Sequence, residues 1–580
     1  MSDTTVTPEQ QLRECQANPV VYSSTMATTW FIDPPAPDKY KMRSGNDIKL
    51  LNCGEAYLRE LRDAINDATD SIYIAIWGFD DELSLVLLKP GDEAKPENYI
   101  SKILEDKAAG KDGKKPVEVK ILVYYNWIAE NLEPTFDETA WLDLFSQKTW
   151  SQRARDGEFP NLQFMTRDYT ASYVKMGWLK FATHHQKCIL IDHRISEKAN
   201  GFVQGFNFKP EYFDFADHPY RENEKPNWQD VGLHLRGPCL IDLFHNFQEG
   251  WNKALNDPLD HQSLLAKALD RNKSLNDQIV GMDKKIIDSI VEAPPIINPI
   301  TDIRTYNAQI LRTWMLNGET SICNFITNAI PRINEFIYIE DQYFRYPHFA
   351  DQLMNRGSDI RKKCGNQKSL YVFVVLSPNK VAVGEPDNRL IMVDFLGRND
   401  VDADKEDFNE RQSEKIHQKI IDDMNKNGVM VHICQLLASG KTKNWINQEV
   451  IDYKNIYVHA KLSIYDDAYL LLGSANWNQR SMKQDSELDI AVQYHDGQCD
   501  DGRGRQFREE LWSAHLRQNW DSNNNKGKLT EPKEWYKQWD ELLQKNWKLF
   551  IKKEPLIMNL FPYYENLKVL RWKSIKQWFD

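Results

Sequence analysis

The stretch His185-Gln-Lys-Cys-Ile-Leu-Ile-Asp192 recurs later in the chain as His459-Ala-Lys-Leu-Ser-Ile-Tyr-Asp466. Both copies follow the pattern His-x-Lys-x-x-x-x-Asp. Each is followed by a turn that ends in asparagine, Gly205-Phe-Asn207 in the first copy and Gly473-Ser-Ala-Asn476 in the second. The apolar residues after each lysine are typical of a buried strand. Side chains at positions i and i+2 of a strand project from the same face, so each histidine should lie beside its lysine.

The same order of flanking segments surrounds both copies, which indicates a duplicated fold. Two apolar runs precede each copy. Two segments follow it: an alternating strand that begins with an acidic residue, and then an aromatic-rich helix. These segments are Ser71–Trp77, Val117–Tyr125, Asp230–Leu235 and Leu243–Trp251 in the first half, and Phe336–Glu340, Leu370–Leu376, Glu487–Val492 and Phe507–Trp512 in the second. Strands separated by helical stretches predict an α/β fold with two tandem domains, each a mixed β-sheet flanked by helices. The two motifs share one site only if these domains pack as a pseudo-dimer.

The boundary between the two halves is expected at a proline-rich segment. Three prolines between residues 294 and 299 cannot lie inside a helix or a central strand. The preceding residues, 262–291, have apolar positions at helical spacing. We therefore predict five units. They are an N-terminal extension (1–44), a first repeat domain (45–260), a helical linker (261–304), a second repeat domain (305–520) and an aromatic-rich C-terminal segment (521–580).

Composition argues against several classes of protein. The 580 residues carry 73 Lys plus Arg against 85 Asp plus Glu, a formal net charge of −12, which disfavours binding of nucleic acid through a basic face. No apolar run approaches the roughly 18 residues of a transmembrane helix, and the first residues lack the basic start of a signal peptide. Eight scattered cysteines without a CxxC pair favour reduced thiols over a zinc site. We expect a protein without a transmembrane segment that is cytoplasmic in the producing cell or is secreted without a cleavable signal.

The repeated motif suits the cleavage of a phosphodiester. A lysine ammonium neutralises the non-bridging phosphate oxygens, while the neighbouring histidine attacks phosphorus or protonates the leaving oxygen. Two halves packed face to face bring two histidines, two lysines and two asparagine amides around one phosphate. These residues are His185, Lys187 and Asn207 from the first half, and His459, Lys461 and Asn476 from the second. The lysines and amides supply the positive field that a metal would otherwise provide, so we expect neither a metal nor another cofactor.

The two motifs resemble the signature of the phospholipase D superfamily, HxKxxxxD followed by GSxN. The resemblance extends from about residue 45 to 520, and the second copy matches in full, with Gly473, Ser474 and Asn476. The first copy departs from the signature: it has an insertion near residues 193–200, and Gly205 occupies the place of Ser474. The resemblance implies that Gly205, Gly473 and Ser474 lie at the phosphate, and that the missing serine removes one possible hydrogen-bond donor to it.

The resemblance also implies a two-step displacement through a phosphohistidine. We assign His185 as the nucleophile and His459 as the general acid and base, and the opposite assignment remains open because the two copies are alike. Asp230 and Glu487 are expected to orient the histidines, with Asp485 as the substitute for Glu487; solvent-exposed strand carboxylates are the alternative interpretation. Asp192 and Asp466, at strand ends, are expected to be structural.

The expected reaction is hydrolysis of glycerophospholipids to phosphatidic acid and a free head-group alcohol. Other members of the superfamily leave three alternatives: transphosphatidylation like that of cardiolipin synthases, metal-independent nuclease action, and non-catalytic binding of lipid or phosphate. The acidic charge favours lipid over nucleic acid. Trp178, in an aromatic and lysine-containing segment before the first motif, is expected to contact the membrane surface. The tryptophans of the C-terminal segment, from Trp535 and Trp539 onward, suit either the membrane interface or the core.

The opening residues suggest a branch of the superfamily. Trp30-Phe-Ile-Asp-Pro-Pro and Asn46-Asp-Ile-Lys-Leu-Leu are similar to bacterial phospholipases D delivered as antibacterial effectors by type VI secretion. That resemblance implies a secretion apparatus and an immunity protein as partners, beside the peripheral contact with phospholipid. A resident cytoplasmic enzyme fits the same residues. Because one chain carries both half-sites, a monomer suffices for the chemistry.

Overall fold

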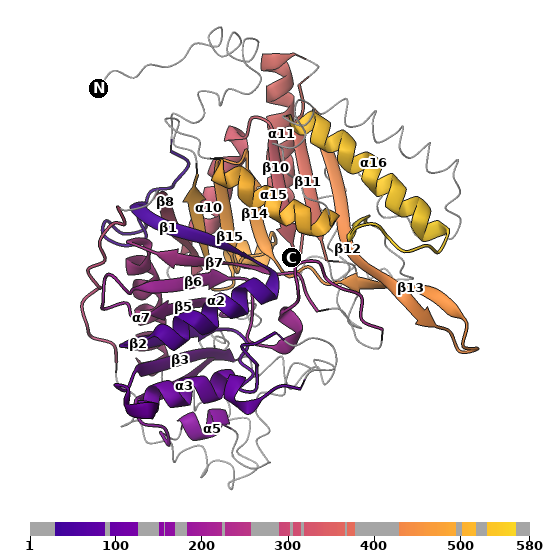
Figure 1. Ribbon diagram of the computed structural model, residues 1–580. Helices are drawn as coiled ribbons and strands as arrows, with labels where there is room; N and C mark the ends of the chain where they lie inside the picture. Colours follow the sequence, from indigo (N-terminus) through magenta and orange to yellow (C-terminus); the bar gives the residue numbers. More distant parts are fainter. Residues whose placement is uncertain are drawn as a thin grey trace, which may run out of the picture.

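The computed structural model describes most of both halves of the chain (Figure 1). The residues that the structure describes are 29–87, 93–125, 150–155, 157–168, 183–222, 227–256, 289–301, 305–314, 318–365, 368–377, 428–494, 502–517 and 531–563. The helix predicted over 262–291 and the unstructured start of the chain fall almost entirely outside these residues. The proline-rich segment from residue 292 to 299 is described, and it contains neither helix nor strand, as its prolines predict.

The first half contains a mixed sheet of seven strands in the order β1-β7-β6-β5-β2-β3-β4. The strands β2, β3 and β4 are parallel, and the remaining neighbours are antiparallel. Their bounds are β1 Arg43–Asn52, β2 Ser71–Ile76, β3 Glu118–Tyr125, β4 Leu162–Asp168, β5 Cys188–Ile191, β6 Asn200–Gln204 and β7 Val231–Arg236. The first motif enters this sheet at β5.

The second half repeats this strand order as β8-β16-β15-β14-β10-β11-β12. Its bounds are β8 Tyr306–Trp314, β10 Phe336–Asp341, β11 Leu370–Leu376, β12 Val429–Lys443, β14 Lys461–Tyr465, β15 Tyr469–Gly473 and β16 Glu487–Gln493. Three additional strands extend its edges: β9 (Glu319–Thr320), β13 (Glu449–Ile456) and β17 (Leu560–Pro562). The duplication inferred from the sequence is therefore present strand by strand. The insertion in the first copy lies in the connection 192–199 between β5 and β6, against 466–468 in the second half.

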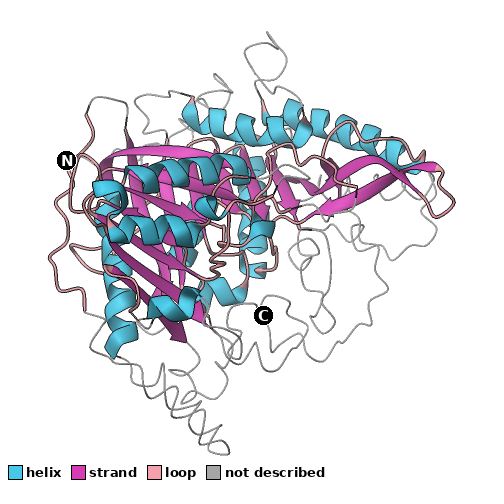
Figure 2. Ribbon diagram, turned by 60° about the horizontal axis from the view of Figure 1, so that its bottom comes forward, coloured by secondary structure: helices cyan, strands magenta, loops and turns pink. Residues whose placement is uncertain are grey.

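The two sheets meet at their equivalent edge strands. β1 pairs with β8 in antiparallel register at Arg43–Ala308 and Asn46–Tyr306, so that the strands form one continuous sheet. Figure 2 shows the strands of both halves running through the molecule between helices. The predicted α/β class, with a mixed sheet in each half, is confirmed, and the domain boundaries drawn from the sequence stay predictions.

Helices cover both faces of each sheet. In the first half α2 and α3 pack on the outer face and α7 on the inner face; α10, α11 and α15 take the equivalent places in the second half. The helices are α2 Cys53–Asp67, α3 Ile100–Ala109, α5 Trp150–Arg155, α7 Cys239–Asn256, α10 Ser321–Ala329, α11 Pro347–Cys364, α14 Gln479–Lys483, α15 Arg503–Leu516 and α16 Pro532–Ile551. This two-sided cover explains why β2 and β11 are continuous apolar runs, buried along their whole length.

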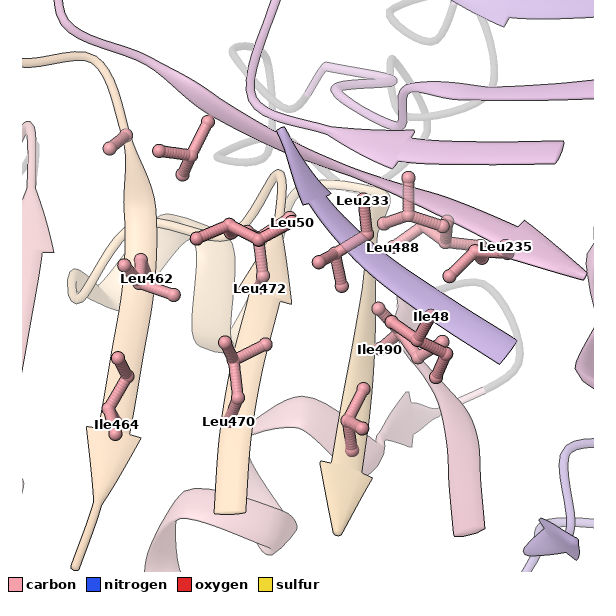
Figure 3. Close-up of a cluster of buried hydrophobic side chains, with 14 of the residues drawn as sticks. Ile48, Leu50, Leu233, Leu235, Leu462, Ile464, Leu470, Leu472, Leu488 and Ile490 are labelled. Atoms are coloured by element: carbon pink, nitrogen blue, oxygen red, sulfur yellow. The ribbon is translucent and has the colours of Figure 1, made fainter. Parts of the chain in front are cut away.

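The largest hydrophobic core is shared by the two halves. It joins side chains of β1 and β7 from the first half to side chains of β14, β15 and β16 from the second. Figure 3 shows Leu50 and Leu233 lying over Leu472 and Leu488 in this layer. Burial of these aliphatic side chains stabilises the association of the halves by about 25 cal/mol for each Å² removed from water. The pseudo-dimer therefore has a common interior and is more than a polar contact.

Candidate active site

The residues that lead into each motif form an isolated β-bridge with the other half of the chain. The backbone N–H of His185 donates to the carbonyl of Ser486 at 2.8 Å, and the N–H of Ser486 donates to Thr183 at 2.8 Å. On the other side, the N–H of His459 donates to the carbonyl of Gln229 at 2.8 Å, and the N–H of Gln229 donates to Tyr457 at 2.8 Å. These two exchanges fix the backbones of both motifs against the strands that carry the acidic residues.

The rings of His185 and His459 lie close together in a T-shaped arrangement. Their centroids are 6.5 Å apart with an angle of 66° between the ring planes. The side chain of His185 is 16% exposed and that of His459 is 5% exposed, so both reach the site from a largely buried position. Two imidazoles at this separation can act on opposite sides of one phosphorus atom.

Each histidine is held by a carboxylate of the opposite half. Nδ1 of His185 lies 3.1 Å from Oε2 of Glu487, and Nδ1 of His459 lies 2.8 Å from Oδ2 of Asp230. The carbonyl of Ser474 is a second partner of the His185 Nδ1, at 3.1 Å. A carboxylate on Nδ1 places the proton there and leaves Nε2 as the reactive nitrogen. Neither Nε2 has a hydrogen bond within the part of the chain that the structure describes.

Glu487 is fixed by two serine hydroxyls. Ser474 Oγ donates to Oε2 at 2.6 Å, and Ser481 Oγ donates to Oε1 at 2.7 Å. The sequence placed Ser474 at the phosphate, whereas the structure directs its hydroxyl to the carboxylate that orients His185. A contact of Ser474 with the phosphate itself stays a prediction.

Gly205 explains how the first copy works without that serine. A β-carbon built on Gly205 would overlap the carboxylate of Asp230, the residue equivalent to Glu487. The shorter aspartate thus occupies the space that a serine side chain would need, and it accepts a hydrogen bond from the N–H of Val231 at 2.8 Å. The two halves therefore fit a carboxylate beside the turn with different pairs of residues. The first half combines glycine with aspartate, and the second combines serine with glutamate.

A second reciprocal exchange supports the adjacent turn. In the second half Gly473 leaves room for Asp489, whose Oδ1 accepts from the N–H groups of Ser474 at 2.8 Å and Ala475 at 3.0 Å. In the first half the equivalent positions are Gln204 and Gly232, and the Gln204 side chain bonds to Tyr57 and Phe206. Gly473 therefore leaves space for a supporting carboxylate, and its place at the phosphate stays a prediction.

The two lysines are buried beside their histidines. Lys187 Nζ donates to the carbonyl of His185 at 2.7 Å, and Lys461 Nζ donates to the carbonyl of His459 and to Gln342 Oε1 at 3.3 Å. Each ammonium keeps further donor capacity, because an ammonium has three N–H bonds. This arrangement allows both lysines to contact the oxygens of an anionic group placed between the histidines.

Burial sets the protonation of the basic groups in the site. It lowers the pKa of Lys187 to about 7, partly opposed by Glu487, and the pKa of Lys461 to about 8, opposed by Asp230 and Asp341. Burial and the adjacent lysines also lower the pKa of His185 and bring that of His459 well below 6.5. Both imidazoles are therefore neutral near pH 7 until an anion enters, and an anion favours their protonated forms.

The carboxylate of Asp230 is affected in the opposite direction. Burial raises its pKa to about 7, against the lowering effect of Lys461. In the free site these opposite shifts give Asp230 a stronger hold on a proton than His459. Negative charge arriving at Nε2 shifts that balance toward an imidazolium, which is the form that a general acid needs.

The two asparagines have different surroundings. Asn207 donates from Nδ2 to the hydroxyl of Tyr212 at 2.9 Å and accepts the N–H of Gly78 at Oδ1, at 3.2 Å. Asn476 is buried, and its Oδ1 has no hydrogen-bond partner among the residues that the structure describes. The pair predicted from the repeat is therefore symmetric in sequence position but not in contacts.

Asp192 and Asp466 hold strand starts. Asp192 accepts the backbone N–H groups of residues 69–71 at the start of β2, at 2.7–3.1 Å. Asp466 does the same for residues 334–336 at the start of β10, at 2.6–3.0 Å. Their oxygens are thus used inside the fold. Asp485 pairs with Arg480 at 3.1 Å and accepts from the N–H of Thr183, and Glu487 holds the histidine.

The structure tests the two interpretations of the C-terminal tryptophans but not the predicted membrane contact of Trp178. Trp178 lies outside the described residues. Trp535 and Trp539 pack in the shared core against Trp512, with ring centroids 5.7 and 4.9 Å away. For these two tryptophans the interfacial interpretation is wrong and the core interpretation is confirmed. Their positions, four residues apart on α16, bring both to one buried face of the helix.

Aromatic rings that the sequence analysis did not single out surround the histidines. Tyr212 and Trp228 lie 4.9 and 5.4 Å from the His459 ring, and Trp77 lies 6.1 Å from the His185 ring. Trp77 follows β2 directly and Trp228 precedes Asp230 by two positions, so their nearness to the landmarks was the available signal.

Comparison with known proteins finds two family models and several relatives that match this sequence. The family model for phospholipase D matches residues 439–563, and the model for the cardiolipin synthase PLD-like domain matches residues 373–500. Phospholipase D alpha 1 of Cynara cardunculus is 24% identical over 83% of this chain and 66% of its own length, and the enzyme of that name from Oryza sativa is 24% identical over 84% and 67%. The chain belongs to the phospholipase D superfamily.

The chain spans about two thirds of the length of these plant relatives. Among solved structures, the phosphatidylserine synthase of Haemophilus influenzae Rd KW20 aligns over 87% of this chain and 94% of its own, with 14% identity and a TM-score of 0.44. None of the helices in the described ranges has the length and apolar content to cross a bilayer. Within the same ranges, no cluster of three or more His, Cys, Asp or Glu side chains is arranged to hold a metal ion. Assignment to the type VI effector branch of the phospholipase D superfamily stays a prediction.

Proposed function

We propose that this protein is a phospholipase D that hydrolyses the distal phosphodiester bond of glycerophospholipids, giving phosphatidic acid and a free alcohol. The observation that carries the proposal is the pair of imidazoles, 6.5 Å apart, each with its Nδ1 on a carboxylate from the opposite half. That arrangement presents two Nε2 atoms to one substrate and anchors both rings from behind.

In the first step, Nε2 of His185 attacks phosphorus and the bond from phosphorus to the head-group oxygen breaks. The proton on Nε2 of His459 passes to that oxygen, so the alcohol leaves neutral. The phosphorylated ring of His185 keeps its Nδ1 proton and carries positive charge, which the Glu487 carboxylate stabilises. Lys187 and Lys461 stabilise the negative charge on the non-bridging oxygens in the transition state.

In the second step a water molecule replaces the alcohol. His459 takes a proton from the water through Nε2, the hydroxide oxygen bonds to phosphorus, and the bond from phosphorus to His185 breaks. His185 returns to the neutral imidazole and His459 to the imidazolium, so the cycle closes without a change in charge. Asp230 stabilises the imidazolium at both stages through the 2.8 Å contact to Nδ1.

Lipid is the substrate class best supported. The plant relatives bear the name phospholipase D, and the net charge of −12 disfavours the polyanionic backbone of a nucleic acid. The match of residues 373–500 to the cardiolipin synthase model favours one alternative, transfer of the phosphatidyl group to an alcohol in place of water. Both reactions share the first step and differ in the acceptor that reaches the phosphohistidine.

The test is product analysis with purified chain. Vesicles containing phosphatidylethanolamine and phosphatidylcholine are incubated with the protein in EDTA, with and without glycerol or ethanol. The lipid products are then separated and identified by mass spectrometry. Phosphatidic acid without added alcohol supports hydrolysis, and predominance of the exchanged lipid supports transfer. Plasmid DNA in the same buffer is the third arm. Cleaved DNA with unchanged lipids would reject the proposed function.

A further inference from the structure

The strand that leads into the second motif belongs to a long hairpin that projects from the body of the protein. β12 and β13 pair from Leu436–Ile456 out to Lys443–Glu449, and β13 ends three residues before His459. Figures 1 and 2 both show this hairpin extending beyond the rest of the sheet. At about 3.4 Å per residue, its tip reaches on the order of 25 Å from the base of the pairing.

The lower part of the hairpin is braced from both sides. On one side Tyr220 packs over Gly440, and its hydroxyl donates to Asp452 at 2.9 Å. On the other side the hydroxyl of Tyr453 donates to the carbonyl of Glu554 at 2.7 Å. These contacts hold the lower part of the hairpin against neighbouring segments of the protein.

The tip beyond these braces is apolar and basic. Trp445 is 94% exposed and Ile446 is 48% exposed, so two large apolar side chains lie next to each other on the surface of the turn. Exposed lysines at 441 and 443 flank them; Lys441 pairs with Glu449 at 2.7 Å. The turn itself is ordered by Asn444 Oδ1, which accepts the N–H groups of Ile446 at 3.1 Å and Gln448 at 2.9 Å.

We propose that the hairpin tip, residues 441–450, docks the enzyme on the phospholipid bilayer that contains its substrate. The indole and the isoleucine enter the interface between head groups and acyl chains, and the lysines contact lipid phosphates. This inference rests on the proposed function, because it gives the lipid-cleaving site its membrane contact.

A bilayer suits this tip better than a protein groove. Tryptophan prefers the membrane interface, where its ring meets apolar chains and its N–H remains hydrated, and lysine beside it extends to the phosphates. A protein interface of ordinary size requires about 800 Å² from each partner, which a single turn with three exposed apolar side chains, Trp445, Ile446 and Val450, does not offer. Insertion of a single indole and an aliphatic side chain requires no such area, since each buried CH₂ contributes on its own.

The test compares Trp445→Ser with a matched control at another exposed apolar site. Ile296→Ser makes a similar change on the segment 289–301, where the side chain is 86% exposed and Asn298 is held by Ser196. Binding of the full-length chain to vesicles of phosphatidylethanolamine and phosphatidylglycerol is measured by co-sedimentation. Trp445→Ser should need about tenfold more lipid for half-binding, while Ile296→Ser should match the wild type. Trp445→Phe should retain most of the binding.

Turnover separates this inference from the proposed function. On a short-chain phospholipid that stays monomeric, Trp445→Ser should turn over at the wild-type rate, and on vesicles it should lose activity in parallel with binding. Equal vesicle binding by Trp445→Ser and wild type, or no vesicle binding by the wild type, overturns the docking role whether or not lipid is cleaved. Absence of lipid cleavage with Trp445-dependent binding instead rejects the proposed reaction and keeps the docking surface.

Discussion

Gly205 and Ser474 hold the same place in the two halves but support different carboxylates. A serine at 205 would overlap Asp230 and push it away from His459, because the β-carbon position is already filled by that carboxylate. We expect Gly205→Ser to lower kcat at least 100-fold, whereas Ser474→Ala, which removes one hydrogen bond to Glu487, should cost about 10-fold. Initial rates on a monomeric phosphodiester give both values. Near-equal losses would show that the two positions are supported alike.

The roles of the two histidines differ in a substrate that needs no general acid. With a p-nitrophenyl phosphodiester, His459→Ala should release one equivalent of nitrophenolate and then stop, because the first step proceeds but water is not activated. Mass spectrometry of the quenched protein should find the adduct on His185. His185→Ala is the control and should give no burst. An adduct on His459 in that control would exchange the two roles.

The alkaline limb of the pH profile should report the buried lysines. In the free enzyme the pKa of Lys187 is lowered to about 7 and that of Lys461 to about 8, from an ordinary value of 10.5. Above these pH values each ammonium loses its proton, and the site loses positive charge for the phosphodiester. We therefore expect kcat/KM to fall as the pH rises from 7 to 9. A profile that stays flat beyond pH 9 would mean that both lysines remain charged in the free enzyme.

The lowered pKa values of Lys187 and Lys461 should affect folding stability and activity in opposite directions. The unfolded chain binds more protons than the folded chain between pH 7 and 10.5, so the two lysines let folding stability rise with pH across this window. Activity should fall where stability rises. The lysines are thus kept for the reaction and at a cost to the fold, which is common for buried charges in active sites.

At the scale of elements, Gln229 joins two buried networks beneath His459. Its Oε1 accepts from His218 Nε2 at 2.9 Å, its Nε2 donates to Glu340 Oε2 at 3.1 Å, and its carbonyl accepts the N–H of His459. Gln229→Leu would leave His218 and Glu340 without that partner in a buried region, at about 1–3 kcal/mol for each. We expect a melting temperature lower by several degrees and a reduced kcat. An unchanged melting temperature would mean that the two networks do not depend on the amide.

Sequence periodicity could predict the helices and strands. It could not predict which residues meet across the interface between the two halves. The repeated motif, the apolar runs of β2 and β11 and the helices α7 and α15 could all be predicted, because each is encoded by local spacing. The exchange of Asp230 and Glu487 between halves could not, since spacing along one chain does not reveal which strand of the other half lies opposite. The hydrogen bond from Ser474 to Glu487 could not be predicted either, because it depends on the packing of β16. The exposed Trp445 was missed because exposure is a property of the folded hairpin.

At the scale of the whole molecule, neither half contains a complete site. His185 needs Glu487 and His459 needs Asp230, while Trp30, ahead of β1, stacks on Tyr469 of the second half with centroids 4.6 Å apart. Either half alone would also expose the leucines and isoleucines of the shared core to water (Figure 3). The pseudo-dimer is thus a single unit in both catalysis and folding, whatever the covalent connection between its parts.

This unity predicts the behaviour of a cut chain. With a protease site inserted between residues 257 and 288, cleavage should leave the two fragments in one peak on size exclusion and keep activity within about twofold, because the interface carries a common core and backbone pairing. Either fragment expressed alone should be inactive, and mixing the two after joint refolding should restore turnover. Fragments that separate at micromolar concentration would contradict an interface held by a common core. One fragment with activity of its own would contradict a shared site, because its histidine would then find a carboxylate within its own half.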